Sequence, residues 1–300
     1  MQTDSAPPPG GETGGQPTGT PPATAGATAV PRAGRNLPVA IAVGVGLSSL
    51  VLVCVLLAPL LFVALVTVAV AIAIYELSSA LTGSGGARLP IVPMIAGGAA
   101  IELAAYRYGA GGLVLALLLT VAAAALWLLP SAERGYLHDV TASCFTAVYV
   151  PFLAGFSVLL VAQSDGAMRV IGFVLTTVAS DIGGYIAGVL KGKHKMAPVV
   201  SPKKTWEGFA GSVAGCVLAG LFTLLVLLDG TWWQGVLFGL GVVVSATLGD
   251  LGESLIKRDL GIKDMGKLLP AHGGIMDRLD SLLPTAPVAW LLLTAFVPSA

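Results

Sequence analysis

Long apolar runs separated by short polar segments fill this chain from residue 37 onward. A helix that crosses a membrane needs about 20 mostly apolar residues. The apolar segment 37–81 is too long for one such helix. We expect it to divide at Ala58-Pro59, because proline interrupts a helix. The further runs cover residues 90–106, 111–129, 140–162, 169–190, 209–228, 233–250 and 284–297. The pattern predicts an all-α polytopic membrane protein with about nine transmembrane helices, the last of which is short and could begin at Ser281.

Composition supports the membrane-protein class and distinguishes the N-terminal segment from the rest of the chain. Hydrophobic residues make up 55% of the 300 positions and charged residues 11%, which is far more apolar than an average soluble domain. Residues 1–36 are instead rich in Pro, Gly, Thr and Ala and have no apolar periodicity. We predict a disordered tail over 1–36, which is too long and polar for a signal peptide, and a transmembrane domain over 37–300.

The positions of Lys and Arg predict the orientation. Cytoplasmic loops hold an excess of these residues. With the N-terminus inside, all of the 16 Lys and Arg except Arg107 and Arg169 lie on the cytoplasmic side. We therefore predict a multi-pass protein of the cell membrane whose N-terminus is cytoplasmic. Residues 191–208 and 251–283, the two long polar connections, then meet soluble nucleotides. Acidic residues also total 16, so net charge points to no partner, and no nucleic-acid partner is predicted.

Residues 250–281 concentrate charge in an otherwise apolar protein. If the helix of 233–250 continues, one face carries residues spaced at i, i+3, i+4 and i+7, namely Asp250, Glu253, Ser254 and Lys257. The spacing recurs after a Gly-Gly pair, at Asp277, Asp280 and Ser281. Converging carboxylates beside basic residues suit magnesium-dependent chemistry on a nucleoside triphosphate. The alternative is a solvated juxtamembrane loop with ordinary ion pairs.

The same stretch carries a family resemblance. Residues 254–280, SLIKRDLGIKDMGKLLPAHGGIMDRLD, closely resemble the signature of phosphatidate cytidylyltransferases. In that signature Ser, Lys-Arg, Lys-Asp, Pro-x-His-Gly-Gly and Asp-Arg-x-Asp recur at these spacings. The resemblance extends to Gly249-Asp250-Leu251-x-Glu253 and to the loop from Ser201 to Gly208, SPKKTWEG, so it covers roughly residues 170–290. The earlier spans match only in character.

The resemblance implies an enzyme of phospholipid biosynthesis that transfers a cytidylyl group from CTP to phosphatidic acid. It also implies that Asp250 and Asp277 are ligands of a catalytic metal centre. Mg²⁺ is the expected ion, and a monovalent cation such as K⁺ is the expected second occupant. The residues that we predict to be catalytic are Lys203, Lys204, Asp250 and Asp277. The residues that we predict to contact substrate are Ser201, Glu207, Lys257, Arg258, Lys263, Asp264, His272, Gly273, Gly274, Arg278 and Asp280.

Alternative roles are open for the two loop lysines, for Asp181 and for His272. Lys203 and Lys204 suit phosphate contacts, but two lysines between spans can also be ordinary membrane anchors. Asp181 lies inside an apolar run, where an ionisable residue is functional by default, and we predict it as a further metal ligand. The family usually has Thr or Ser after this Asp, whereas this chain has Ile182, so Asp181 could instead pair with a loop lysine. His272 could be a base, a metal ligand or a residue that orients the loop, and we favour the last.

Two rival functions remain open on the sequence alone. An enzyme that uses CTP with an isoprenoid-ether phospholipid or a polyprenol would share the headgroup chemistry. A cation transporter would line an ion path with Asp181, Asp250 and Asp277. Transporters often show inverted repeats, and the sequence contains no second copy of the Asp-Gly-Gly or His-Gly-Gly segments. We favour the enzyme, whose partners would be CTP, phosphatidic acid and membrane lipid, with a homodimer as an open alternative to a monomer.

Overall fold

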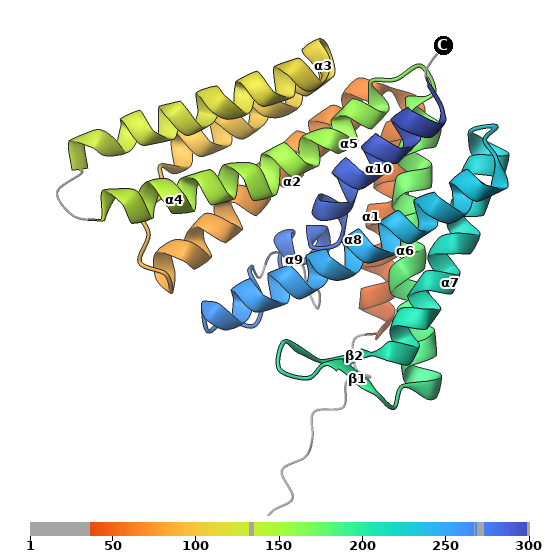
Figure 1. Ribbon diagram of the computed structural model, residues 1–300. Helices are drawn as coiled ribbons and strands as arrows, with labels where there is room; N and C mark the ends of the chain where they lie inside the picture. The colour runs from red at the N-terminus through yellow and green to blue at the C-terminus, as the bar shows by residue number, and fades with distance from the viewer. Residues whose placement is uncertain (1–36, 132–134, 267, 269–272, 299–300) are drawn as a thin grey trace, which may run out of the picture. The chain divides into compact units, whose positions relative to one another are not determined.

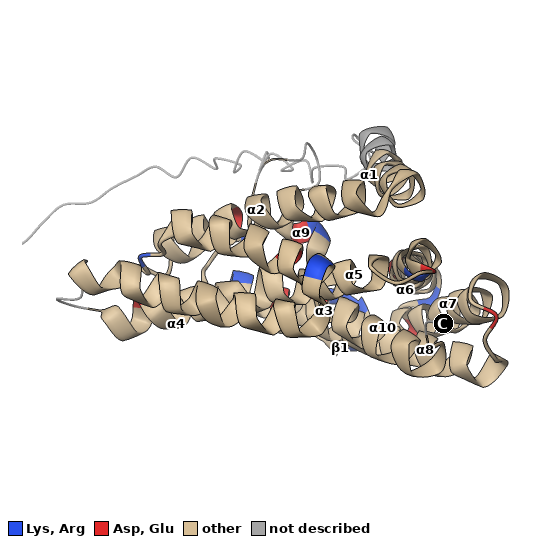
Figure 2. Cartoon of the chain, turned by 90° about the horizontal axis from the view of Figure 1, so that it is seen from above, with Lys and Arg blue, Asp and Glu red and all other residues tan. Residues whose placement is uncertain are grey.

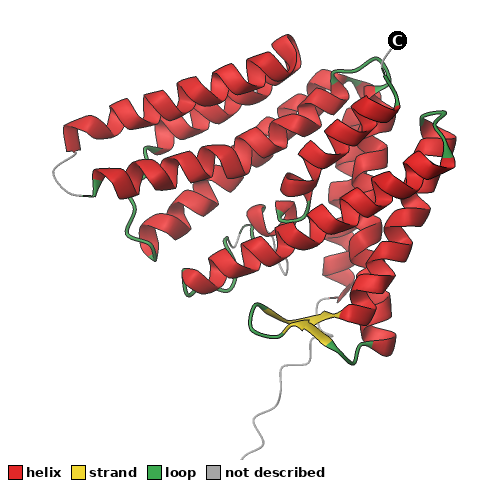
Figure 3. Ribbon diagram, in the orientation of Figure 1, coloured by secondary structure: helices red, strands yellow, loops and turns green. Residues whose placement is uncertain are grey.

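The structure is a computed structural model that describes residues 37–131, 135–266, 268 and 273–298. The predicted disordered tail, residues 1–36, lies outside the described residues. The described chain is almost entirely helical, as Figure 3 shows, and this confirms the all-α membrane class. A single short β-hairpin is the exception within the described part.

The first two helices meet at the predicted proline. Helix α1 spans Leu37–Leu57 and helix α2 spans Pro59–Gly83. Ala58 between them is extended, with φ −165° and ψ 135°, because the residue before a proline avoids the helical region. The predicted division of residues 37–81 into two spans is therefore confirmed.

Helix α3, Ile91–Leu128, is a helical hairpin rather than one straight rod. Gly109 has φ 68° and ψ −154°, a conformation that L-residues with side chains rarely adopt. The two arms run antiparallel in Figure 1, and a Cβ on Gly97 would overlap the side chain of Thr120 in the opposite arm. A straight helix of 38 residues would be about 57 Å long, roughly twice the hydrocarbon core. The reversal gives the two predicted spans, 90–106 and 111–129.

The next span is continuous but bent. Helices α4, Tyr136–Ala147, and α5, Leu153–Val161, are joined by a π-helical turn over Val148–Phe152. Pro151 lies in this turn. Proline has no N–H and its ring crowds the preceding turn, which accounts for the wider local geometry.

Helices α6 and α7 pack very closely, with a hairpin between them. Helix α6 spans Gly166–Lys191, strands β1 and β2 span Lys195–Ala197 and Ser201–Thr205, and α7 spans Trp206–Phe222 with a π turn over Thr223–Leu227. The strands are antiparallel and pair Lys195 with Thr205. A Cβ on Gly211 of α7 would overlap the carbonyl oxygen of Gly183 in α6. Small residues thus let the two backbones touch, as is common between membrane helices.

The last helices carry the charged region. Helix α8 spans Trp232–Asp259, the short α9 spans Met276–Leu279, and α10 spans Leu282–Phe296. Helix α8 continues well past Asp250, which confirms that its charged positions share one continuous helix. The last span begins at Met276 if α9 is included, earlier than the predicted residue 284.

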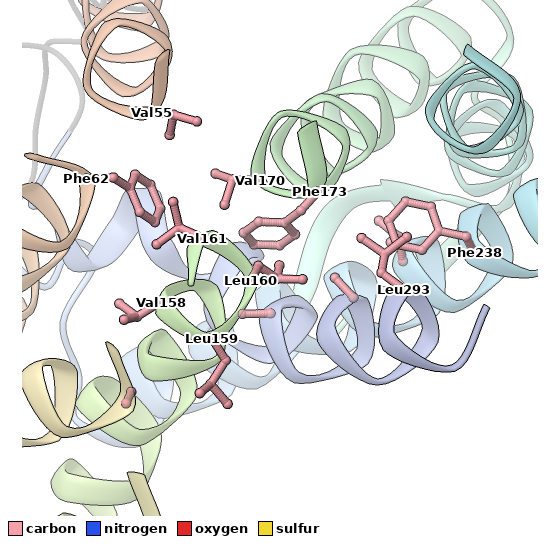
Figure 4. Packing of buried hydrophobic residues seen from close by; sticks show 14 of the residues in the cluster. Val55, Phe62, Val158, Leu159, Leu160, Val161, Val170, Phe173, Phe238 and Leu293 are labelled. Carbon is pink, nitrogen blue, oxygen red and sulfur yellow. The ribbon is translucent and has the colours of Figure 1, made fainter. Parts of the chain in front are cut away.

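Among the residues that the structure describes, seven helical segments are long and apolar enough to cross a membrane. Since α3 supplies two arms and α1 adds a further apolar helix, the described residues agree with a count of about nine. Most of the ribbon in Figure 2 is tan because few helical residues are charged. Between the helices, Phe62, Val161, Phe173 and Leu293 contribute to a packed apolar cluster, drawn in Figure 4.

One buried charge fastens the end of the last helix. The guanidinium of Arg169 on α6 donates to the carbonyl oxygens of Leu293 and Val297, and it pairs with Asp165 one turn earlier. The Arg169 side chain is only 1% exposed. The donor to Val297 therefore satisfies a carbonyl just past the end of α10, while the Leu293 carbonyl also accepts from the Val297 N–H.

Candidate active site

A cavity of about 310 Å³ lies among α6, strand β2, α7 and α8. Its polar lining includes the following residues: Ser180, Asp181, Ser201, Lys203, Lys204, Thr205, Ser212, Thr247, Asp250 and Ser281. Five of these, Asp181, Ser201, Lys203, Lys204 and Asp250, come from the set predicted from sequence. Segments far apart in the chain thus bring predicted residues to one place.

Lys204 and Asp250 form an ion pair within this cavity. Lys204 Nζ lies 2.6 Å from Asp250 Oδ2, and the two side chains are 22% and 35% exposed. Strand β2 supplies the lysine and α8 supplies the aspartate. Asp250 also accepts a longer hydrogen bond, 3.4 Å, from the hydroxyl of Ser254 one turn later. The pair places one positive and one negative group where a charged substrate can reach both.

Asp181 faces the same cavity from α6. Its side chain is exposed and lines the cavity together with Lys204 and Asp250. No hydrogen bond or ion pair joins Asp181 to Lys204 or to another described residue. The alternative prediction, in which Asp181 pairs directly with a loop lysine, therefore has no contact to support it in the described chain.

Small residues determine the shape of the cavity. A Cβ on Gly184 would lie 2.5 Å from the Ser212 hydroxyl, so glycine lets α7 come close to α6 at this level. Ser212 then donates to the carbonyl oxygen of Ser180 at 2.7 Å. At the start of α7, the Thr205 hydroxyl accepts from the Gly208 N–H at 3.1 Å, which caps the helix. The SPKKTWEG loop is thereby held beside the glycine-rich end of α6.

Asp277 belongs to a second, buried cluster and is absent from the cavity lining. Its carboxylate accepts from Lys257 Nζ at 3.0 Å, from the Gly274 N–H at 2.8 Å and from the Met265 N–H at 3.0 Å. Lys257 also lies 3.4 Å from Glu253, which is fully buried. Asp280, three residues after Asp277, lies between the two clusters, because a Cβ on Gly249 beside Asp250 would overlap the Asp280 carbonyl oxygen.

The remaining predicted residues lie around these clusters. Glu207 pairs with His194 at 2.6 Å and accepts from the Lys193 N–H, so it holds the turn after α6. Arg258 donates to the carbonyl oxygen of Val200 at the tip of the hairpin. The side chains that lie exposed without lining the cavity are Lys263, Asp264 and Arg278. The backbones of Gly273 and Gly274 both lie next to the Asp277 carboxylate. His272 lies outside the described residues.

The cavity suits a magnesium ion that a substrate helps to bind. In the part of the chain that the structure describes, no three His, Cys, Asp or Glu side chains are grouped so as to hold a metal alone. Mg²⁺, however, is usually bound by one or two carboxylates together with phosphates and water. Asp250 and Asp181 offer two carboxylates among hydroxyl groups, a hard oxygen donor set that fits this ion. Asp277 fits less well because N–H donors occupy its carboxylate.

The sequence did not indicate several polar groups at the site, among them Thr247 and Glu76. Thr247 lines the cavity. Thr247 lies three residues before Asp250, so helical spacing could have indicated it. Glu76 on α2 accepts from the Met276 N–H at 2.9 Å, across 200 positions. No local pattern around Glu76 predicts this contact.

Comparisons with known proteins agree with these features. Residues 38–296 match the model of the cytidylyltransferase family. A phosphatidate cytidylyltransferase of Mycobacterium leprae is 42% identical over 280 residues, covering 88% of this chain and 89% of the relative. The protein of that name in Mycobacterium bovis is 41% identical over 281 residues, covering 89% and 92%. One in Staphylococcus haemolyticus is 38% identical over 165 residues, covering 54% and 62%.

Proposed function

This chain belongs to the cytidylyltransferase family, and we propose that it transfers the cytidylyl group of CTP to phosphatidic acid. The products are CDP-diacylglycerol and pyrophosphate. The observation that carries this proposal is the cavity in which Lys204 and Asp250 meet, beside the SPKKTWEG loop and the charged end of α8. Relatives that bear the name phosphatidate cytidylyltransferase align over most of the chain.

An apolar pocket beside the cavity supports a lipid as the second substrate. It has a volume of about 120 Å³ and is lined by apolar residues of α2, α5, α6 and the α9–α10 turn, among them Phe62, Phe173, Leu279 and Leu282. Ser281 in the same turn lines the polar cavity. A phosphate group in the polar cavity and an acyl chain in the apolar pocket would therefore lie on either side of one turn.

The proposed reaction is an in-line displacement at the α-phosphorus of CTP. A phosphate oxygen of phosphatidic acid forms the new O–P bond, and the bond to the β-phosphate bridging oxygen breaks, so that pyrophosphate leaves with the electron pair. Such reactions depend on positioning and charge stabilisation more than on a base. Lys204, with Lys203 next to it on β2, supplies positive charge to the phosphates, and the Ser201 hydroxyl can donate a hydrogen bond.

Asp250 and Asp181 would hold Mg²⁺ in this cavity. A bound ion would supply positive charge that offsets the negative charge of the phosphates. Asp250 is oriented for this role by Lys204 and Ser254. The metal-ligand role of Asp277 and the binding of a monovalent cation stay predictions. In the arrangement described, Asp277 instead holds Lys257 and the backbone of the signature loop in place.

We also propose that the cavity opens to the cytoplasm. The hairpin beside it carries Lys195 and Lys203, and α6 ends at Lys191. Lysines at the ends of membrane helices favour the cytoplasmic side. CTP would then enter from the cytosol while the lipid stays in the bilayer.

A lipid panel tests the proposal against its rivals. Purified protein in detergent receives radiolabelled CTP, Mg²⁺ and one lipid at a time: phosphatidic acid, an isoprenoid-ether phosphate lipid or a polyprenyl phosphate. We expect a CDP-lipid product with phosphatidic acid above the others. A preference for an isoprenoid lipid would overturn the lipid assignment. Cation flux in proteoliposomes without CTP turnover would support the transporter instead.

A further inference from the structure

The buried carboxylate of Glu76 has no assigned role and lies against the signature loop. Glu76 is on α2, and its side chain is 6% exposed. Around it, α2 is apolar, with Ala73, Ile74 and Leu77 fully buried in one hydrophobic cluster. A carboxylate inside a membrane segment is costly, and such residues mark functional positions. A leucine would satisfy the packing alone, so packing does not explain a glutamate here.

The contacts of Glu76 are with the backbone of Gly266, Gly274 and Met276. We call the described residues 265, 266 and 273–276 the signature loop. Oε2 accepts from the Met276 N–H at 2.9 Å. A Cβ on Gly266 or on Gly274 would overlap the Glu76 carboxylate. The carboxylate therefore lies directly against the backbone at both glycines. A side chain at either position would occupy the space that the carboxylate fills.

A second carboxylate, that of Asp277, also contacts the signature loop. Asp277 accepts from the N–H groups of Met265 and Gly274, as described above. Glu76 and Asp277 together accept N–H donors at both ends of the loop. Because α9 begins at Met276, the contact of Glu76 also fixes where α9 starts, and with it the position of Asp280. Asp280 lies against α8 next to the cavity, because a Cβ on Gly249, the neighbour of Asp250, would overlap the Asp280 carbonyl oxygen.

We propose that Glu76 is a positioning residue for the cytidylyl transfer, which anchors the signature loop and α9 to helix α2. This inference rests on the proposed function. Glu76 does not line the cavity, so it does not touch CTP. Its removal shifts the acidic groups carried by α9 and slows the chemical step, while CTP binding through Lys204 is retained.

The first test separates kcat from KM. Glu76→Leu keeps the volume but removes the acceptor, and we expect kcat to fall about 10- to 100-fold with little change in the KM for CTP. Glu76→Gln keeps one acceptor oxygen and should stay within about threefold of wild type. The matched control is Glu102→Leu, which removes a fully buried glutamate of α3 whose carboxylate makes no hydrogen bond within the described chain. This control should retain kcat.

A double-mutant cycle tests the contact itself. Gly266→Ala should lower kcat in the wild-type background, because its Cβ would overlap the Glu76 carboxylate. In the Glu76→Ala background the same change should have little further effect, since the overlapping group is gone. Full activity of Glu76→Leu, or equal losses from Gly266→Ala in both backgrounds, would overturn the proposal. A loss in Glu102→Leu as large as in Glu76→Leu would overturn it too.

Hydrogen exchange distinguishes this inference from the proposed function. In Glu76→Leu, amides of the signature loop should exchange faster than in wild type, while those of α7 should not change. If wild type makes no CDP-diacylglycerol but the exchange changes, the reaction assignment fails and the anchoring holds. If wild type is active and exchange in the loop is unchanged, the anchoring fails and the reaction holds.

Discussion

Replacement of Lys204 by methionine separates a catalytic from a structural role for the ion pair in the cavity. Lys204 and Asp250 are both partly exposed, and such pairs contribute about 1 kcal/mol or less to folding. The melting temperature of Lys204→Met should therefore stay close to wild type. A hydrogen bond between a charged group and a phosphate contributes about 1.5–3 kcal/mol, which corresponds to roughly 10- to 150-fold in rate or affinity.

The assay is steady-state pyrophosphate release with CTP and phosphatidic acid. We expect kcat/KM for CTP to fall by that factor in Lys204→Met. Lys195→Ala is the matched control, because Lys195 lies on strand β1 of the same hairpin but outside the cavity lining. It should keep nearly full activity. The reasoning is refuted if Lys204→Met works as well as Lys195→Ala, or if both lose activity equally.

Further predictions concern stability and the metal. Gly211→Val should destabilise the protein by about 1–3 kcal/mol or more, because the new side chain meets the Gly183 carbonyl, and the measurement is a lower melting temperature. Gly252→Ala is the control and should not lower the melting temperature, because the space around Gly252 is open. Arg169→Leu should lower the melting temperature, at a cost of about 1–3 kcal/mol, because it leaves the Val297 carbonyl without its donor and Asp165 without its partner. Removal of Mg²⁺ by a chelator should abolish turnover, and added Mg²⁺ should restore it; full turnover in the chelator would contradict the magnesium proposal.

The spans were predictable because their signals are local. Run length, the proline at residue 59 and the polar residues near Gly109 give the helices and their breaks within a few residues. The hairpin of β1 and β2 was not predicted, since its strands have three and five residues and no alternating pattern. Its pairing depends on the positions of α6 and α7, which sequence periodicity does not determine.

The candidate site was predictable in its members but not in their arrangement. Asp250 and Asp277 have similar local patterns, so the sequence treats them alike. The structure places Asp250 in the cavity with Lys204 and places Asp277 against Lys257 and two backbone N–H groups. Which lysine faces which aspartate depends on how strand β2 and α8 pack. The role of Glu76 was not predictable from local sequence, because its contact with Met276 is entirely tertiary.

The central claim is that CTP and phosphatidic acid react in the cavity that holds Asp250. The most direct measurement is pyrophosphate release by purified wild type and Asp250→Asn with CTP, phosphatidic acid and Mg²⁺, each omitted in turn. The account predicts release only when all three are present, and loss of that release in a variant that stays folded. Release that continues in Asp250→Asn, or that does not need phosphatidic acid, would contradict it.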